Sequence, residues 1–472
     1  MKRALICMAL SLCPLFVDAQ IANNTSLVGT VVDANNGVVA QCKITAVEES
    51  TKVQSTAITN NNGYYSIAFL LPGTYDITVE RQGFEKVTKH SVVVPVDRAV
   101  RTDFTLPVGS TETTVTVSAN TPPLSTDDAT LGESFDTNAV ANLPVNGHSA
   151  LDVAANASNV YVGGRSSYRL GEDFEGAGMR EDQNSLSLDG VSIMDDLIVT
   201  TFAHTAAEMI ATTQVQSGNY PPQYGDYLGV HINMVSKNGT NGLHGEAYEY
   251  VQNTAFNARP FISLPGSAAP RLNLNQYGFQ AGGPVYIPRL YDGRDKTFFF
   301  GSYEKYNQKS QATSISSVLT PAMESGDFSA PGIPQIYDPS TGLPYQNNKI
   351  PLGELNTPAA QVAKNYEAYM ASPNLPGISN NLNNSYPNNI LVEQSIDRID
   401  HNIGQDVKLF ARAYWDNLSF LNGAPFAADE YGGPANSWNY AIGYTHVLSP
   451  RLVNDLRFGV NKLTTGTFNY FI

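Results

Sequence analysis

Hydrophobic and polar residues alternate over many short stretches of the chain, and a period of two residues predicts β-strands. The N-terminal part contains seven such stretches, separated by turn signals such as Asn35-Asn36-Gly37 and Pro72-Gly73. Gly and Asn tolerate the positive φ angles that tight turns require. We therefore expect a small β-sandwich over residues 26–108. Its strands are predicted at Leu27–Val32, Val39–Val47, Val53–Ile58, Tyr64–Ala68, Thr74–Glu80, Lys86–Val94 and Val100–Leu106.

The middle of the chain, residues 124–240, mixes short apolar runs with polar segments, as a small α/β domain does. Short helices are predicted at Val140–Leu143 and Ala203–Ile210. Strands are predicted at Leu186–Leu188, Thr213–Gln216 and Val230–Val235. Asp189 and Gly190 form a turn signal directly after Leu188, so we interpret these three residues as a structural hairpin. A direct role of Asp189 in binding a ligand is the alternative.

Residues 241–472 contain longer alternating runs. Between Val407 and Asp416, the odd positions from Leu409 share one face and the even positions from Lys408 share the other. This pattern fits the wall of a transmembrane β-barrel and equally a soluble antiparallel sheet. Residues 307–395 are rich in Pro, Asn, Gly and Ser and are expected to form long external loops. Strands are predicted at Glu246–Gln252, Gln276–Tyr286, Thr297–Tyr306, Arg398–Ile403, Val407–Asn417, Tyr440–Val447 and Leu452–Asn461.

The first 19 residues have the pattern of an export signal. Lys2 and Arg3 precede an apolar stretch that ends at Val17, and the predicted cleavage lies between Ala19 and Gln20. The apolar stretch is shorter than the roughly 20 residues that a membrane-spanning helix needs. Cleavage leaves Cys42 as the single cysteine, so an intramolecular disulfide is not expected. It also changes the net charge from −15 to −16.

The charge and composition of the chain argue against some classes of protein. The net charge of −15 argues against a nucleic-acid-binding protein, which needs a basic face to neutralise phosphates. Only 15% of residues are charged and 42% are hydrophobic, which argues against a disordered acidic chain. The chain has 25 Tyr and 20 Phe but only 2 Trp, as expected of a mainly β protein. No segment after the leader has 18 consecutive apolar residues, so any membrane crossing is expected to use strands.

Motifs of common enzyme classes are missing from the sequence. The seven histidines do not form an HExxH motif, and the chain has no Gly-x-Ser-x-Gly elbow, Walker loop or CxxC pair. The acidic pairs Glu181-Asp182 and Asp195-Asp196 are interpreted as solvated surface rather than as a cation site. We therefore expect no catalytic residue, no metal and no cofactor.

Three short sequence segments of the N-terminal part resemble the carboxypeptidase regulatory-like domain, which has a transthyretin-like fold. The segments are Val28–Val31, Thr59–Tyr65 and Leu71–Tyr75. The resemblance implies an accessory module rather than a catalyst.

Phrases of the middle part are similar to the plug of TonB-dependent outer-membrane receptors, in the Oar-like subgroup that carries an N-terminal regulatory-like domain. In chain order they are Leu143–His148, Ser187–Val191, Gln214–Tyr220, Gly229–Asn233, Val235–Asn241 and His244-Gly245. Further phrases, such as Gln276–Val285 and Lys296–Phe300, resemble the first barrel strands of that family. The resemblance implies a plug at 124–240, a barrel from 241, and a transporter in contact with outer-membrane lipid. Its N-terminal domain is expected in the periplasm.

Residues 109–123 are expected to link the sandwich to the plug, and they contain a candidate TonB-binding box. The segment Glu112, Thr113, Thr114, Val115, Thr116 and Val117 resembles the box that adds as a strand to the sheet of TonB. The alternatives are a final strand of the sandwich or a plain linker.

The family's barrel has 22 strands, which at about 10 residues each need roughly 220 residues before any loop. We count seven strand candidates after residue 241 and expect a fragment or a truncated product with part of a barrel. The ligand, a small molecule or an oligosaccharide, cannot be read from the loops. The alternative function is a non-transporting surface-binding or adhesion protein with the same architecture.

Overall fold

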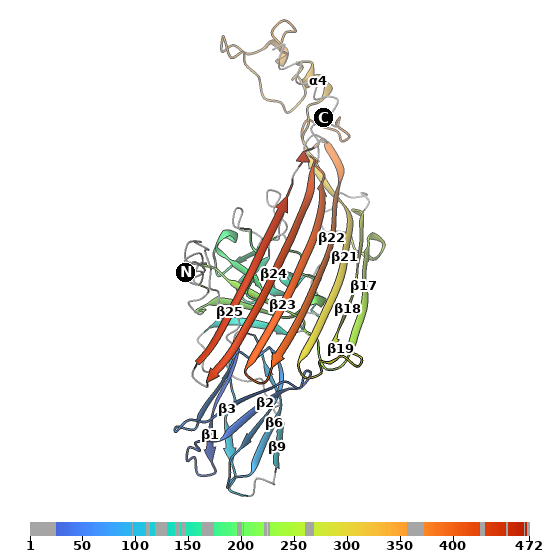
Figure 1. The fold of residues 1–472 in the computed structure, drawn as a ribbon. Helices are drawn as coiled ribbons and strands as arrows, with labels where there is room; N and C mark the ends of the chain where they lie inside the picture. Colours follow the sequence, from blue (N-terminus) through green and yellow to red (C-terminus); the bar gives the residue numbers. More distant parts are fainter. Residues whose placement is uncertain are drawn as a thin grey trace, which may run out of the picture.

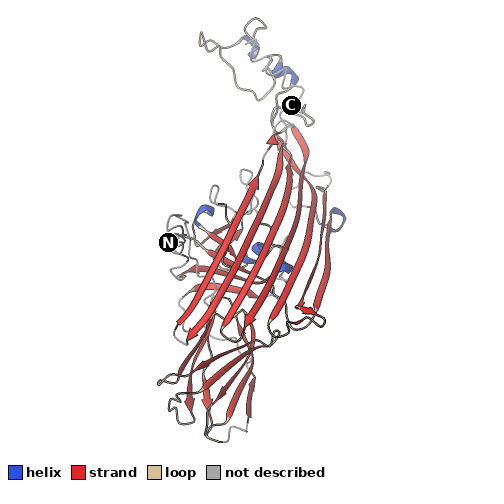
Figure 2. Ribbon diagram, in the orientation of Figure 1, coloured by secondary structure: helices blue, strands red, loops and turns tan. Residues whose placement is uncertain are grey.

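The computed structural model describes residues 25–96, 98–109, 114–118, 130–136, 139, 142–143, 148–162, 174–195, 201, 203–220, 224, 227–259, 269–355, 372–424, 430–449, 452–466 and 468–469. Within these ranges the chain is mainly β, as predicted (Figure 2). Figure 1 shows a small sandwich below, a tall tilted sheet in yellow to red, and a green sheet beside its inner face.

The sandwich consists of two sheets. One sheet has the order β4-β1-β7, with β8 also paired to β1, and the other has the order β3-β2-β5-β6-β9. The strands are β1 (Ser26–Asp33), β2 (Lys43–Glu48), β3 (Gln54–Ile58), β4 (Tyr64–Ala68), β5 (Gly73–Glu80), β6 (Lys86–Val94), β7 (Ala99–Arg101), β8 (Phe104–Leu106) and β9 (Thr114–Ser118). Apolar side chains such as Leu27, Ile44, Ile77 and Phe104 are buried between the sheets. The seven predicted strands are present, although β2 begins later and the last is split into β7 and β8.

Gly29 explains why a glycine occurs inside β1. A Cβ atom at this position would lie 2.1 Å from the carbonyl oxygen of Thr102. The same oxygen accepts a hydrogen bond of 2.6 Å from the hydroxyl of Tyr65, which is buried. The close approach of the two backbones therefore requires a residue without a side chain.

The inner sheet, as we call the second unit, has the order β10-β15-β16-β13-β14. Its strands are β10 (Leu131–Asp136), β13 (Ser185–Leu188), β14 (Val191–Ser192), β15 (Ile210–Gly218) and β16 (His231–Ser236). Accompanying elements are the helix α3 (Ala150–Ala154), the 3-10 turns η1 (Glu181–Gln183) and η2 (Ala207–Met209), and the paired strands β11 (Val160–Val162) and β12 (Phe174–Gly176). The three predicted strands are confirmed.

The helix predicted over Ala203–Ile210 is wrong. Only the short turn η2 forms there, and Ile210 already begins β15, which pairs antiparallel with β16. The β-branched residues that follow Ile210 favour the extended backbone of a strand. Val140 and Ala141, from the other predicted helix, lie outside the described residues.

The wall, as we call the tall sheet, is antiparallel throughout with the order β17-β18-β21-β22-β23-β24-β25. Its strands are β17 (His244–Asn253), β18 (Leu272–Pro284), β21 (Thr297–Ser316), β22 (Leu382–Ile403), β23 (Val407–Asn422), β24 (Tyr431–Ser449), β25 (Leu452–Thr465) and the short β26 (Phe468–Asn469), paired with β24. The remaining elements are the hairpin β19 (Tyr286–Ile287) and β20 (Tyr291–Asp292), the turns η4 (Thr254–Phe256) and η5 (Gln346–Asn348), and the helix α4 (Pro321–Glu324).

All seven predicted wall strands are present, but the loop predicted over residues 307–395 is too long at both ends. β21 and β22 stay in register from Tyr306 opposite Val392 to Ser316 opposite Leu382. The ends of these strands are rich in Asn, Ser and Thr, whose polar side chains do not prevent backbone pairing. The wall therefore extends beyond its apolar band toward α4 (Figure 1).

The two faces of the wall differ as the alternation in Val407–Asp416 predicts. Arg412, Tyr414 and Asp416 point to the inner sheet and are buried. On the other face, four aromatic rings form a row that runs from β18 to β24, with centroid distances of 5.9–6.3 Å. The row consists of Phe279, Tyr303, Trp415 and Trp438. Such a row is typical of the aromatic belt at a membrane interface.

No helix in the described part of the chain is both long and apolar enough to cross a bilayer.

The sandwich is attached to the lower end of the wall (Figure 1). The backbone N–H of Asn241 donates to the carbonyl of Ser50 at 3.0 Å. The ammonium group of Lys408 donates to the carbonyl of Phe69 at 3.2 Å. The sandwich therefore lies where β22 turns into β23.

Candidate functional site

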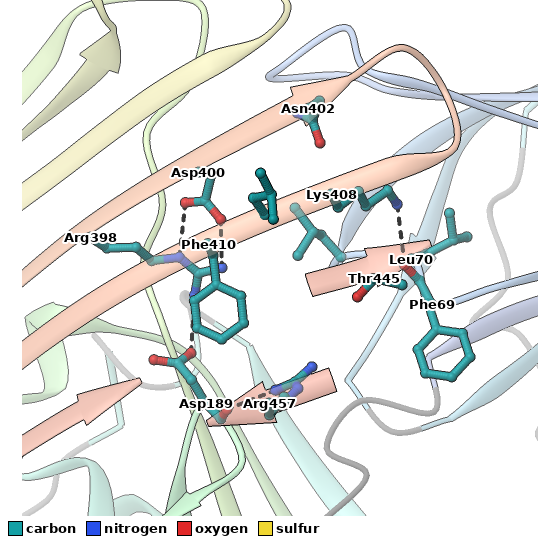
Figure 3. A pocket seen from close by; sticks show the side chains of 12 residues that line it. Phe69, Leu70, Asp189, Arg398, Asp400, Asn402, Lys408, Phe410, Thr445 and Arg457 are labelled. Carbon is teal, nitrogen blue, oxygen red and sulfur yellow. Dashed lines mark hydrogen bonds and ion pairs between the residues drawn. The ribbon is translucent and has the colours of Figure 1, made fainter. Parts of the chain in front are cut away.

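The site begins at the hairpin turn of the inner sheet. Leu188 pairs with Val191, so Asp189 and Gly190 are the two central residues of a tight turn. Both have positive φ, 50° and 76°. Glycine adopts such angles freely, and Asp is among the few other residues that tolerate them. The chain forms a hairpin at these residues, and its turn directs the carboxylate of Asp189 toward the wall (Figure 3).

The carboxylate of Asp189 is buried and joins the inner sheet to two wall strands. One oxygen accepts from Arg398 of β22 at 3.0 Å, and the other accepts from Arg412 of β23 at 3.1 Å. Ser236 of β16 donates its backbone N–H at 3.0 Å and its hydroxyl at 2.8 Å. The carboxylate thus has four donors, which is what a buried charge requires.

The arginines have further partners that fix their positions. Arg398 forms a second, two-pronged ion pair with Asp400, at 2.8 and 2.9 Å. Arg412 donates to the carbonyl of Leu188 at 2.9 Å. Arg457 of β25 donates to the carbonyl of Asp189 at 2.7 Å. Three wall strands therefore hold one turn of the inner sheet.

The surroundings of Asp189 favour its charged form. Burial alone would raise the pKa of Asp189, but the guanidinium groups of Arg398 and Arg412 and the hydrogen bonds from Ser236 hold it below its ordinary value. The contact is therefore ionic at neutral pH.

An aromatic ring separates the arginines. The ring of Phe410 lies 5.0 Å from the guanidinium carbon of Arg398 and 5.4 Å from that of Arg457, which are cation–π distances. Gly443 on β24 leaves room for this ring, because a Cβ there would lie 2.1 Å from it. These contacts explain why an apolar residue lies among the charged side chains of this face.

The sandwich reaches the same cluster. Phe69, Leu70 and Leu71 line a pocket together with Asp189 and the wall residues described above (Figure 3). Phe69 has a φ of 57°, which is rare for a bulky residue, and its carbonyl accepts from Lys408. Sandwich, inner sheet and wall therefore meet at one place.

A second polar contact joins the inner sheet to the wall farther from the sandwich. The backbone N–H of His204 donates to Asp416 at 2.9 Å, and that of Ala206 donates to Gln394 at 3.3 Å. The hydroxyl of Tyr250 donates to Glu208 at 2.6 Å, and its ring stacks on His148 with centroids 3.9 Å apart. Here too the contact is made by hydrogen bonds rather than by apolar packing alone.

The other predicted site residues fall in different places. Thr114, Val115, Thr116 and Val117 belong to β9 on the edge of the sandwich, whereas Glu112 and Thr113 lie outside the described residues. Ala19 and Gln20 also lie outside them, so the predicted cleavage is untested. Sequence reasoning did not identify Arg398, Arg412 and Arg457 as site residues. A usable signal is that Arg398 and Arg412 occupy the same alternating positions as the other buried polar residues of their strands.

The chemistry of this arrangement is reversible attachment rather than catalysis. Among the described residues, no group of three or more His, Cys, Asp or Glu side chains is placed to hold a metal ion. The ion pairs of Asp189 join separate units of the chain, and water can replace each of them. The site therefore holds the inner sheet on the wall by noncovalent contacts alone.

Comparison with known proteins agrees with this architecture. The family model described as outer membrane beta barrel domain matches residues 235–471, and that of the carboxypeptidase regulatory-like domain matches residues 26–107. A curated relative, the TonB-dependent transporter Oar of Myxococcus xanthus, is 23% identical over 298 residues. The match covers 61% of this chain but only 27% of the relative. It agrees with the prediction that the chain is not an enzyme.

Two solved bacterial structures match part of the chain. The outer membrane transporter YddB of Escherichia coli has a TM-score of 0.47 at 9% identity, covering 72% of this chain and 40% of its own. BauA, the ferric preacinetobactin receptor of Acinetobacter baumannii, has a TM-score of 0.38 at 11% identity, covering 72% and 48%. The outer membrane beta barrel model matches half of this chain and includes the whole wall. The chain therefore belongs to the outer-membrane β-barrel family and is located in the outer membrane.

Proposed function

We propose that the chain is a TonB-dependent outer-membrane transporter, with residues 124–240 as the plug and residues 241–472 as part of the barrel. The observation that carries the proposal is the buried carboxylate of Asp189, which pairs with Arg398 and Arg412 of two wall strands. A domain fixed permanently in a wall needs only apolar packing. Ion pairs on a lumen-facing wall can exchange for hydration when the domain is pulled away.

The remaining parts follow from this role. The sandwich at residues 26–108 lies at the periplasmic mouth, and the linker at 109–123 carries the contact with TonB. TonB pairs with Glu112–Val117 and transmits a pulling force to the plug. The ligand is a small molecule or an oligosaccharide that enters past the loops between β21 and β22. Oar, the curated relative, is a TonB-dependent transporter by name, which supports this proposal.

The test uses binding to the periplasmic domain of TonB. Purified full chain in detergent should retain this domain on a pull-down resin, and a variant lacking residues 112–117 should not. A deletion of equal length in the exposed turn at Asp338–Leu343 is the control and should bind like the unaltered chain. Equal binding by the 112–117 deletion would contradict the role of these residues as the TonB-binding box. Failure of the unaltered chain to bind would contradict the proposal and favour an adhesion protein without energy coupling.

A further inference from the structure

The candidate box is already part of a sheet. β9 runs parallel to β6, with register pairs from Lys86 opposite Thr114 to His90 opposite Ser118. In the sheet order β3-β2-β5-β6-β9 it is the edge strand. One side of its backbone is therefore already hydrogen-bonded to the sandwich.

The chain leading to β9 is positioned by the sandwich as well. The backbone N–H of Glu85 donates to the carbonyl of Pro107 at 2.9 Å, and that of Gly109 donates to Gly83 at 3.3 Å. Both contacts lie directly before β6 begins. They place Pro107 and Gly109 beside the residues that precede β6, the strand with which β9 pairs.

The pairing of β9 differs from that of its sheet. The pairs β2–β3, β2–β5 and β5–β6 are antiparallel, whereas β9 pairs parallel with β6. Parallel pairs are slightly less stable per residue than antiparallel ones. A partner that offers an antiparallel strand of the same length can therefore replace β6.

A pulling force can reach the inner sheet only after β9 has left β6. β9 lies between the end of the sandwich at Leu106 and the start of the inner sheet at Leu131. While β9 stays on β6, a force applied to it loads the sandwich, which is itself attached to the wall through Phe69 and Lys408. Only a released β9 passes the force along the chain to the inner sheet.

We propose that the sandwich stores residues 114–118 as its edge strand and that the strand of TonB pairs with them only after they leave β6. This inference rests on the proposed function, because it takes these residues as the TonB-binding box. The sandwich then holds the box until the energy-coupling partner displaces it from β6, because only a displaced strand passes a force to the inner sheet.

The experiment locks β9 onto β6. The variant T88C/T116C places cysteines at register partners on adjacent strands, which are about 4.8 Å apart, within the range that a disulfide bridges. The variant K86C/T114C is a second pair at the same strands. The control is T78C/T88C, which joins β5 to β6 at residues whose hydroxyls are already 3.1 Å apart and leaves β9 free.

The readout is pull-down of each full-length variant by the periplasmic domain of TonB, with the cross-link verified by mass spectrometry. The oxidised T88C/T116C protein should bind at least tenfold more weakly than its reduced form, and the control should bind equally in both forms. If the cross-linked protein binds as strongly as its reduced form, the sandwich does not store the box, whereas the proposed function still stands. Failure of both β6–β9 pairs to cross-link would overturn it too, whereas failure of every reduced protein to bind would overturn the proposed function.

Discussion

At the scale of single residues, the ion pairs of Asp189 determine how firmly the inner sheet is held against the wall. Asp189 contacts one arginine on each of two wall strands, and both arginines are buried. Breaking a buried ion pair by removing one partner is costly, because the other charge is left without compensation in a poorly solvated place. The cost therefore exceeds what the contact adds to stability when both partners are present.

We predict that Asp189→Asn releases the hairpin of the inner sheet. Asn tolerates the positive φ of residue 189 as Asp does, so the turn persists and the charge alone is lost. The free energy of local opening for residues 185–192, measured by hydrogen exchange, should fall by about 3–5 kcal/mol.

The matched control for this variant is Asp397→Asn. Asp397 precedes Arg398 on β22 but is exposed on the outer face of the wall. This change should leave exchange at residues 185–192 unaltered. Equal exchange in the two variants would show that the ion pairs do not hold the hairpin.

The sequence predicts the turn of this site, with Asp189 and Gly190, but not its arginines. Asp189 and Gly190 form a turn signal because both tolerate positive φ, and that property is local. The arginines could not be paired with Asp189 from the sequence, because they lie 209 and 223 positions away. Their contact depends on the register of β22 and β23 and on how the inner sheet is oriented against them.

At the scale of whole strands, the alternation of side chains determines which of them face lipid. Ile442 and His446 lie on the same face of β24, four residues apart. Ile442 is outward-facing within the apolar band, beside Phe458 of β25. His446 lies near the end of β24 next to the sandwich.

We predict that Ile442→Lys destabilises the wall far more than His446→Lys does. A lysine on the lipid face costs about 2–4 kcal/mol at the bilayer midplane and about 0–1 kcal/mol near the interface. Urea unfolding of the protein in lipid vesicles should show this difference. Similar losses for both variants would mean that this face of β24 does not contact hydrocarbon.

Prediction at the element scale succeeded where alternation was strong and failed where it was weak. The wall strands were found because apolar residues recur at every second position. The ends of β21 and β22 were missed because polar side chains there remove that signal while the backbone pairing continues. The turn at Ala207–Met209 was taken for a helix because the apolar run around it fits either period over so few residues.

The attachment of the sandwich is a feature of the whole molecule. Lys408 of β23 donates to the carbonyl of Phe69, and Asn241, which precedes β17, bonds to Ser50. Few contacts of this kind join the described parts of the sandwich and the wall. Each of them therefore contributes strongly to the orientation of the sandwich.

We predict that Lys408→Met loosens the sandwich. Methionine keeps an apolar chain of similar length but cannot donate to Phe69. Distances between spin labels at N62C on the sandwich and Q405C in the β22–β23 turn should become broader when measured by pulsed electron spin resonance. Lys296→Met, at an exposed lysine of the same end of the wall, is the control and should leave the distances unchanged. An unchanged distribution in Lys408→Met would show that this contact does not orient the sandwich.

The place of the sandwich could not be predicted from the sequence. The order of the units along the chain was clear from their turn signals and alternation. The docking contacts, however, use backbone carbonyls, at Phe69 and at Ser50, which any residue type provides. The position of such acceptors depends on loop conformation, including the positive φ of Phe69.

The pairing of Asp189 with the wall arginines also has a kinetic consequence under the proposed function. Once the inner sheet moves away, water enters and each of the three charges acquires a hydration shell. Before the turn can return, these hydration shells must be removed. Desolvation of the carboxylate and guanidinium groups costs free energy before their mutual attraction is regained. Reclosure therefore faces a barrier of its own, and the open interval lasts longer than the pull that began it. Under the proposed function, the lifetime of the open state therefore depends on the dehydration of Asp189 and of both arginines.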